Sequence, residues 1–371
     1  MADSADSPAL RRTPLHDLHV ALGARIVAFA GYEMPLQYRP GIIAEHLHTR
    51  SKAGLFDVSH MGQIRLHGGA AAALERLVPG DLQALAPGQM RYTLLLSEQG
   101  GILDDLMATR TGDGLLLVVN AARKEADLAH LEAHLDRAIT IEPRFERALL
   151  ALQGPAAAAV LARFAAGVER LPFMTGAEVS VCGISCFVTR SGYTGEDGFE
   201  LSVAGDDAVA LADILLNEAE VAPIGLGARD SLRLEAGLCL YGHDIDETTT
   251  PVEAALPWTI GKRRRAEGGF PGAAIIVQQL ADGPGRRRVG LRPDGRAPAR
   301  EGTAILDAAG APLGRVTSGG FGPSVGAPVA MGYVAAAHTA PGTPLSLVVR
   351  DVPRPARVAA LPFVPARYYR A

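Results

Sequence analysis

Short apolar runs alternate with polar residues along most of the chain, and the predicted elements come in an order that occurs twice. The first occurrence follows a predicted helix at 42–53. Its strands are expected at 63–67, 91–96, 102–109 and 115–119, and its helices at 70–78 and 122–138. The second helix is expected to place one apolar face at Leu128, Leu131, Leu135 and Ala138.

The second occurrence has the same order of strand, helix, strands and helix. Its strands are expected at 148–152, 178–181, 187–190 and 199–203, and its helices at 156–164 and 206–219. Because the order recurs at roughly 62–138 and 147–219, we expect two related α+β units. Beyond them, 261–285 is polar and rich in Gly and Arg, which suggests a linker. From 286 to 365, short aliphatic runs between Gly/Pro turns predict a small all-β barrel.

Composition narrows the function classes. A chain of 371 residues is too long for one ordinary core, and two or three domains are expected. The net charge of −4 argues against a generally nucleic-acid-binding surface, and no apolar run approaches the roughly 18 residues of a membrane span. The basic clusters 262–265 and 286–288 are either solvated loops or a docking patch for an acidic partner.

Cysteine use and the N-terminus bear on the compartment. The count of three cysteines, Cys182, Cys186 and Cys239, is odd and sparse, which argues against a disulfide framework and fits a reducing compartment. We interpret all three as small apolar residues. Residues 1–10 carry two aspartates and show no signal or transit pattern, although a processed imported protein would look the same.

The first candidate site is the pair Asp104-Asp105, just after the turn at Gly100-Gly101. Neighbouring strand residues point to opposite faces, so one carboxylate should face inward and the other outward. An inward carboxylate in apolar surroundings needs a partner. Asp105 should share a face with Leu103 and Met107, and Asp104 should share the other face with Ile102 and Leu106. Alternation leaves open which face is inward, and a solvated pair beside a hairpin is the alternative.

The second candidate is the glycine-rich segment 191–200, which ends in Glu200. A phosphate loop would require a following helix and a lysine, whereas a strand follows here and no lysine is present. A turn that lets a flat ring approach the backbone beside Tyr193 fits better; Glu200 as an ordinary strand carboxylate is the alternative. In the helix at 228–237, Arg229 either points into the site, where its fork could hold polar atoms, or forms surface pairs.

Three further residues each allow a functional and a structural interpretation. His60 follows Asp57 and Ser59 within four residues, which is too close for a catalytic triad, so a structural turn is expected. Met61 either lines a pocket or fills the core. Trp258, the only tryptophan, offers a face for a flat ligand or packs between domains.

Several motifs in order resemble the aminomethyltransferases of the glycine cleavage system, the T-proteins. The matching segments are 56–62 (FDVSHMG), 100–106 (GGILDDL), 192–200 (GYTGEDGFE), 228–238 (ARDSLRLEAGL), 250–253 (TPVE), Trp258, 317–319 (TSG), 330–334 (AMGYV) and 362–365 (PFVP). Each motif alone is weak, but together they span nearly the whole chain and are specific.

The resemblance implies a three-domain cloverleaf around a central folate cleft, with two related α/β units and a C-terminal all-β barrel. The expected bounds are 1–54 with 140–260 for a discontinuous first α+β domain, 55–139 for the second, 261–285 for the linker and 286–371 for the barrel. It also implies transfer of a one-carbon unit from the aminomethyl-lipoyl arm of H-protein to tetrahydrofolate, with release of ammonia and formation of 5,10-methylenetetrahydrofolate.

The family pattern assigns roles to residues. Asp105 is expected near folate N10 as the catalytic residue, and Glu200 and Arg229 are expected to contact the ligand. Further folate-lining positions are expected at Met61, Tyr92, Asn120, Phe173, Tyr193, Trp258 and Tyr368. Tetrahydrofolate would be a cosubstrate, with no metal, nucleic acid or membrane involved. The compartment would be a bacterial cytoplasm or, for a processed form, the mitochondrial matrix.

Two rival functions share this fold. One is a folate-dependent demethylase acting on a small sulfonium or methylated amine. The other is a non-catalytic folate-binding protein that assists iron–sulfur cluster maintenance; that branch carries a Lys-Gly-Cys-Tyr/Trp-x-Gly-Gln segment. The nearest stretch here, 237–243 (GLCLYGH), lacks the pattern.

Overall fold

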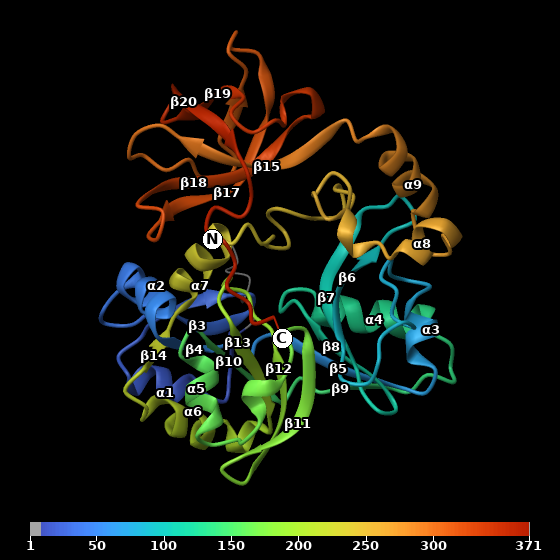
Figure 1. The fold of residues 1–371 in the computed structure, drawn as a ribbon, viewed down its shortest axis with the longest axis vertical. Coiled ribbons are helices and arrows are strands. Elements are labelled where there is room, and N and C mark those ends of the chain that lie inside the picture. The colour runs from blue at the N-terminus through green and yellow to red at the C-terminus, as the bar shows by residue number, and fades with distance from the viewer. Residues whose placement is uncertain (1–8, 371) are drawn as a thin grey trace, which may run out of the picture.

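The structure, a computed structural model, describes residues 9–370 and consists of two mixed α+β bodies and a barrel (Figure 1). Residues 1–8 and 371, which include most of the N-terminal segment analysed for a targeting signal and the outer ends of two expected domains, lie outside the described part. The three bodies surround the point where the C-terminal segment ends (Figure 1). The α+β class with a C-terminal barrel is therefore confirmed.

The first body is a sheet with the strand order β11-β12-β13-β10-β4-β14. Its strands are β4 (Ala53–Asp57), β10 (Ala148–Gln153), β11 (Thr175–Val181), β12 (Ile184–Arg190), β13 (Gly198–Val203) and β14 (Val221–Ile224). The central strand β10 is buried along its whole length, between antiparallel neighbours β4 and β13. Strand β4 runs across the expected domain boundary between residues 54 and 55. The expected domain bounds therefore stay a prediction.

Helices cover this sheet, and a small three-stranded sheet lies beside it. The helices are α1 (His16–Ala21), α2 (Ile42–Ser51), α5 (Ala157–Ala162), α6 (Ala208–Leu216) and α7 (Leu226–Glu235), and the small sheet has β1 (Arg11–Arg12), β2 (Arg25–Phe29) and β3 (Tyr32–Gln37). One face of the main sheet packs with α5 and α6 in the largest apolar core. On the other face, Phe56 and Leu149 pack against Ala228 and Leu232 of α7, which fixes the helix that carries Arg229.

The second body is a five-stranded sheet with the order β6-β7-β8-β5-β9. Its elements are β5 (Gly62–His67), β6 (Met90–Leu96), β7 (Ile102–Arg110), β8 (Gly114–Val119), β9 (Ile141–Pro143), α3 (Ala70–Leu74) and α4 (Lys124–His134). Leu106 of β7 and Leu131 of α4 belong to the same core. The expected hairpin is present, and Gly101 is required there because a Cβ would lie 1.9 Å from the Glu247 carbonyl oxygen.

The helices are shorter than expected from the sequence: those predicted at 70–78 and 122–138 end at Leu74 and His134. The segment predicted to be a linker contains α8 (Lys262–Glu267) and α9 (Ala273–Asp282). Ile276 of α9 is buried with Leu94 and Leu96 of β6. Apolar residues at helical spacing inside a polar, glycine-rich stretch therefore attach this segment to the second body. Within residues 9–370, no helix is long and apolar enough to cross a membrane.

The third body is a closed antiparallel barrel, as the Gly/Pro spacing predicted. Its strands are β15 (Arg286–Pro293), β16 (Ala304–Leu306), β17 (Pro312–Gly322), β18 (Ala327–Ala335), β19 (Pro344–Val349) and β20 (Val352–Ala359). After β20 the chain returns to the first body, where the backbone N–H of Phe363 donates to the Glu235 carbonyl and that of Arg367 to the Gly195 carbonyl. The C-terminal segment thus fastens the barrel to the glycine-rich segment 191–198 (Figure 1).

Candidate functional site

The Asp104-Asp105 pair lies in β7, where both carboxylates are enclosed by protein. Asp104 is 0 % exposed and Asp105 is half-buried. The two faces differ, as expected: α4 covers the Asp104 side, whereas Asp105 on the other face is partly exposed and lies near the segment with Cys239. From Asp104 to Met107 the side chains alternate between the two faces as expected. Before Asp104, a register shift in the pairing of β6 and β7 interrupts the alternation, and Leu103 packs against the same core as Leu106 instead of sharing a face with Asp105.

Asn120 connects the two aspartates from the residue after β8. Its side-chain nitrogen lies 2.8 Å from Asp104 Oδ1 and 2.7 Å from Asp105 Oδ1, and its backbone N–H donates to Asp104 Oδ2 at 3.1 Å. An amide with donors to both carboxylates fixes their relative direction. The sequence placed Asn120 in the site through the family pattern, and the structure shows that its partners are the aspartates.

Electrostatics distinguish Asp105 from an ordinary surface acid. Burial, and next the charge of Asp104, raise the pKa of Asp105 to about 7, while hydrogen bonds from Tyr92 and Asn120 oppose the rise. Burial and the neighbouring Asp127 carboxylate raise the pKa of Asp104 as well. An acid that titrates near neutrality can take up and release a proton at physiological pH, which suits general acid–base chemistry.

Glu200 and Arg229 lie within electrostatic reach of each other on two elements of the first body. Glu200 lies on β13 and accepts a hydrogen bond at 3.1 Å from the Ser191 hydroxyl. Burial raises the pKa of Glu200 and lowers that of Arg229, and the opposite charge of each partner counteracts both shifts. Arg229 Nη1 is buried without a hydrogen-bond partner in the described part of the chain. The site therefore offers an acceptor and a free donor to a polar ligand.

Aromatic side chains lie near these charged groups. The Arg229 guanidinium lies 4.7 Å from the centre of the Tyr193 ring, and the Tyr193 hydroxyl donates to the Cys239 carbonyl. Burial, and further the charge of Asp105, raise the pKa of Tyr193, so Tyr193 lies within electrostatic reach of both bodies. Tyr92 stacks on Trp258 at 5.4 Å, and Trp258 is 62 % exposed.

Other expected lining residues are placed differently. Met61 is half-buried and packs against the core that contains Phe56 and Ala228. Ala228 directly precedes Arg229 in α7. Phe173 stacks on Tyr368 at 4.2 Å with an interplanar angle of 13°. Among residues 9–370, no described contact joins this pair to the side chains around Asp105 or Glu200, so their role in binding stays a prediction.

The turn at 57–60 is structural, as expected from the residue spacing. Asp57 accepts hydrogen bonds from the Thr13 hydroxyl at 2.6 Å and from His19 Nε2 at 2.8 Å. The Ser59 hydroxyl donates to the Leu149 carbonyl, and burial lowers the pKa of His60 to about 4. Each polar group therefore has its own structural environment, and no triad forms.

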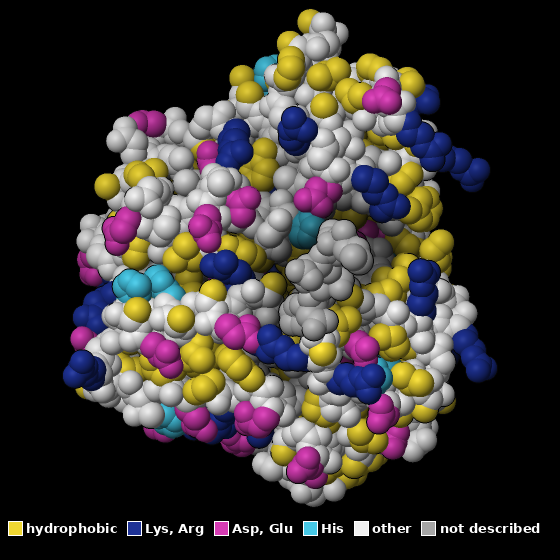
Figure 2. Space-filling model, turned by 180° about the vertical axis from the view of Figure 1, so that it is seen from behind, with side chains coloured by type: hydrophobic (Ala, Val, Ile, Leu, Met, Phe, Trp, Pro, Cys, Tyr) yellow, Lys and Arg dark blue, Asp and Glu magenta, His cyan; other side chains and the backbone are white. Residues whose placement is uncertain are grey.

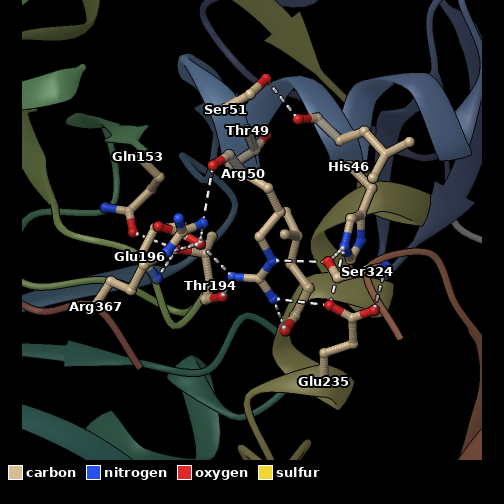
Figure 3. A network of polar contacts seen from close by, with 12 residues as sticks. His46, Thr49, Arg50, Ser51, Gln153, Thr194, Glu196, Glu235, Ser324 and Arg367 are labelled. Carbon is tan, nitrogen blue, oxygen red and sulfur yellow. Dashed lines mark hydrogen bonds and ion pairs between the residues drawn. The ribbon is translucent and has the colours of Figure 1, made fainter. Parts of the chain in front are cut away.

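A buried ion network, which the sequence did not predict, lies between the first body and the barrel (Figure 3). Arg50 of α2 is placed between two acids, with Nη1 2.8 Å from Glu196 Oε1 and Nη2 3.1 Å from Glu235 Oε2. Arg367 of the C-terminal segment also contacts Glu196, and His46 contacts Glu235 at 3.1 Å. Arg367 also donates to the Arg50 carbonyl, 317 residues away in the chain, so no local sequence signal predicts this pairing.

The basic clusters 262–265 and 286–288 are largely engaged inside the molecule. Arg263 is paired with Glu75 and Asp81, Arg264 donates to the Glu75 carbonyl, and Arg288 donates to the Ala254 carbonyl. Basic and acidic side chains are interspersed over the face seen in Figure 2. These clusters mainly attach segments to each other, which counts against a free docking patch.

The cysteines were expected to be small apolar residues outside any disulfide framework. All three cysteines are free; Cys186 and Cys239 are buried, as expected, whereas Cys182 is exposed in a tight turn. Within residues 9–370, no group of three or more His, Cys, Asp or Glu residues is arranged to hold a metal ion.

Comparison with known proteins identifies relatives along the whole chain. Residues 15–264 match the GCVT N-terminal domain model, and residues 286–365 match the model of the glycine cleavage T-protein C-terminal barrel domain. The human mitochondrial aminomethyltransferase is 51% identical over 376 residues, covering 99% of this chain and 93% of the relative. The mitochondrial aminomethyltransferase of Dictyostelium discoideum is 45% identical over 383 residues, covering 98% and 95%.

A solved structure agrees with these relatives. The glycine cleavage system aminomethyltransferase T from Bartonella henselae superposes with a TM-score of 0.93 and 48% sequence identity, covering 97% of this chain and 100% of that one. The likeness therefore extends over both α+β bodies and the barrel.

Proposed function

The chain belongs to the T-protein family of glycine cleavage aminomethyltransferases, and from this premise we propose how its residues carry out the transfer. It is an aminomethyltransferase of the glycine cleavage system. We propose that the donor is the aminomethyl group on the lipoyl arm of H-protein and the acceptor is tetrahydrofolate. The products are ammonia, 5,10-methylenetetrahydrofolate and the reduced dithiol arm.

The bonds that change define what a catalytic residue must do. The carbon–nitrogen and carbon–sulfur bonds of the donor break, and carbon bonds form to folate N5 and N10. The hydrogens leaving N5 and N10 balance the proton taken by the ammonia and the one taken by the sulfur. A residue near N10 must therefore accept a proton and stabilise the positive charge that develops on the transferred carbon.

Asp105 fits this task, and its surroundings carry the proposal. Its carboxyl has a pKa of about 7, so it is partly ionised at neutral pH and can receive the N10 proton. Asn120 and Tyr92 donate to this carboxylate and fix its direction, and its oxygens keep lone pairs that can accept a proton from a substrate. Positioning of the two substrates would supply much of the remaining rate enhancement.

Glu200 and Arg229 suit recognition of the folate. An ionised carboxylate accepts only, and a pterin edge presents adjacent N–H donors. The free Nη1 of Arg229 complements an acceptor on the same ligand. We propose that Tyr92, Trp258 and Tyr193 line the ring, and that Met61, Phe173 and Tyr368 form outer parts of the site.

The setting of the enzyme follows from its chemistry and its relatives. Several of the curated relatives are named mitochondrial. We propose a reducing compartment, either a bacterial cytoplasm or the mitochondrial matrix, consistent with three free cysteines. Tetrahydrofolate acts as a cosubstrate, and we propose no metal, nucleic acid or membrane in the reaction.

One assay tests the function. Purified protein is mixed with aminomethylated H-protein and tetrahydrofolate, and both ammonia and 5,10-methylenetetrahydrofolate are measured. Equimolar formation of both, dependent on each substrate, is expected. Folate-dependent demethylation of a methylated amine or sulfonium with no ammonia from H-protein would favour the demethylase. Folate binding without turnover of either donor would favour a non-catalytic protein.

A further inference from the structure

Behind Asp105 lies a second pair of acids that the proposed reaction does not use. Asp104 of β7 is 0 % exposed and Asp127 of α4 is 1 % exposed. Their carboxyl groups are in hydrogen-bonding contact with each other. The other oxygen of Asp127, Oδ2, is buried and lacks a hydrogen-bond partner within the described residues. Two acids in this position need an explanation, because burial of a single unpaired carboxylate is already unfavourable.

A shared proton provides that explanation. Two ionised carboxylates in contact inside a protein repel each other strongly, whereas a proton between them creates a short, charge-assisted hydrogen bond. The surrounding groups do not neutralise both acids. Arg123 is the cation that acts on Asp127, its Nη2 lies 3.5 Å from Glu247, and its Nε is buried without a partner in residues 9–370.

The remaining neighbours are acids or neutral side chains. The hydroxyl of Tyr241 donates to the Ile102 carbonyl at 3.3 Å, and the pKa of that hydroxyl is raised mainly by burial and further by the charges of Asp104 and Asp127. On the other side, Asp105 is surrounded by Tyr92, Tyr193 and Cys239, which are all neutral at pH 7 because burial raises the pKa of each. A net charge on the Asp104–Asp127 pair therefore acts on Asp105 with little screening.

Asn120 transmits the arrangement of this pair to Asp105. Asp104 accepts from both the backbone and the side-chain nitrogen of Asn120, which fixes the amide plane. The same side-chain nitrogen lies 2.7 Å from Asp105 Oδ1. Movement of Asp104 would therefore rotate the amide and release the Asp105 carboxylate.

We propose that Asp104 and Asp127 share one proton near neutral pH and, through Asn120, act as positioning residues for Asp105. The single negative charge of the pair opposes ionisation of Asp105, and Asn120 sets the direction of its carboxylate. Asp104 and Asp127 do not touch substrate. The inference rests on the proposed function only for its catalytic consequence, because the shared proton is a property of the free protein.

Asp127→Asn tests the shared charge. The substitution removes the charge but keeps an acceptor for the Asp104 hydroxyl, so the bonds from Asp104 to Asn120 can persist. The midpoint of Asp105, followed by carbon-13 NMR of labelled aspartate carboxyls and assigned with Asp105→Asn, should fall by about one pH unit, a typical effect of removing a nearby like charge. The acid limb of the pH profile of kcat/KM for aminomethyl transfer should move in the same direction.

A matched control lies on the same helix. Glu132 of α4 is exposed, and Glu132→Gln removes one charge without touching the pair; the Asp105 midpoint should stay at its wild-type value. Equal midpoints in wild type, Asp127→Asn and Glu132→Gln would overturn the proposal. Loss of activity without a shift in the pH profile would indicate a merely structural role and would overturn it as well.

Infrared spectroscopy of the wild type keeps the proposal testable if Asp127→Asn does not fold. A protonated, buried carboxyl band should be present at pH 8, where free aspartates are ionised, and should be absent in Asp104→Asn. Absence of the band in wild type would refute the shared proton. If Asp105→Asn proves fully active, the proposed catalytic role fails, while the NMR and infrared results still decide the present inference.

Discussion

Two groups of buried acids in this protein are built in opposite ways. Glu196 and Glu235 are surrounded by cations, with Arg50 between them and Arg367 and His46 at the edges (Figure 3). In contrast, Asp104 and Asp105 share the Asn120 amide, Asp127 lies against Asp104, and burial of Asp127 outweighs the neighbouring Arg123 charge.

The pKa values of the two groups diverge accordingly. Hydrogen bonds and charge from His46, Ser324 and Arg50 overcome burial and lower the pKa of Glu235 to about 2. Burial and like charge raise the pKa of Asp105 to about 7. Burial alone therefore does not set the protonation state: Glu235 is fully buried and stays ionised among cations, whereas Asp105 is half-buried beside Asp104 and titrates near neutrality. The compensated group can hold segments together, and the uncompensated group is suited to move protons.

The largest effect is expected from Asp105→Asn. The amide keeps the shape but cannot accept a proton from folate N10, so turnover should fall by about 10²- to 10⁴-fold, the usual contribution of a general base. Folate binding should persist in part, and the fold should be intact because a buried titrating acid has become neutral. Ammonia release under saturating substrates measures the effect.

The matched control for Asp105→Asn is an acid of the compensated group. Glu196→Gln should lower thermal stability through the loss of charge opposite Arg50 and Arg367, while changing kcat far less. Wild-type turnover in Asp105→Asn would remove that residue from the mechanism and end the functional contrast between the groups.

Arg50→Met should have the next largest effect. It removes the cation between Glu196 and Glu235, so that these acids come to resemble the uncompensated aspartate group. The substitution leaves the carboxylates of Glu196 and Glu235 with fewer buried partners, and removal of one member of a buried pair typically destabilises by about 3–5 kcal/mol. Thermal and urea unfolding measure it. Arg163→Met, at an exposed pair with Glu220, is the control and should leave the melting temperature nearly unchanged. Equal losses in both variants would show that burial of the network contributes nothing.

Glu200→Ala sharpens the difference between binding and chemistry. Loss of a charged hydrogen-bond acceptor should weaken tetrahydrofolate binding by about 10- to 100-fold, corresponding to roughly 1.5–3 kcal/mol, with a smaller change in kcat at saturation. Equilibrium titration of the free enzyme provides the dissociation constant. Glu178→Ala removes an exposed acid on the same sheet and serves as the control. An unchanged dissociation constant in Glu200→Ala would contradict the pterin role.

The same contrast shows which features of the structure could be predicted from the sequence. The hairpin at Gly100-Gly101, the inequivalent faces of Asp104 and Asp105, and the barrel follow from local rules of turns and alternation. Asp127 was missed because the apolar face predicted for its helix ran through Leu128, whereas Lys124 and Asp127 are buried with Leu131. A polar residue that is buried with a polar partner has no apolar periodicity to reveal it.

Long-range pairing explains the rest of what the sequence did not show. Arg50 meets its partners only after α2, the glycine-rich segment and the C-terminal segment have packed together. Spacing along the chain carries no information about such contacts. The proposed catalytic residue was easier to find, because Asp105 is adjacent to Asp104 in one strand, although family resemblance was needed to choose between the two.

The smallest effect is a difference in the pH dependence of stability. Because the pKa of Asp104 is raised in the folded protein, the folded state retains a proton that the unfolded chain releases above about pH 4, so this acid destabilises the fold increasingly as pH rises. Asp104→Asn removes that titration. Between pH 5 and pH 8, the unfolding free energy of Asp104→Asn should therefore rise relative to that of the wild type by about 1 kcal/mol or more. Urea unfolding at each pH measures this difference.

Glu235→Gln should show the opposite slope. The pKa of Glu235 is about 2, below its unfolded value, so its stabilisation is fully present above the unfolded pKa and is lost as pH falls through the folded one. The penalty of Glu235→Gln should be constant from pH 8 to pH 6 and should shrink below about pH 5. Slopes of the same sign in Asp104→Asn and Glu235→Gln would mean that the two groups of acids share one electrostatic environment, and the division between a structural and a proton-moving cluster would fail.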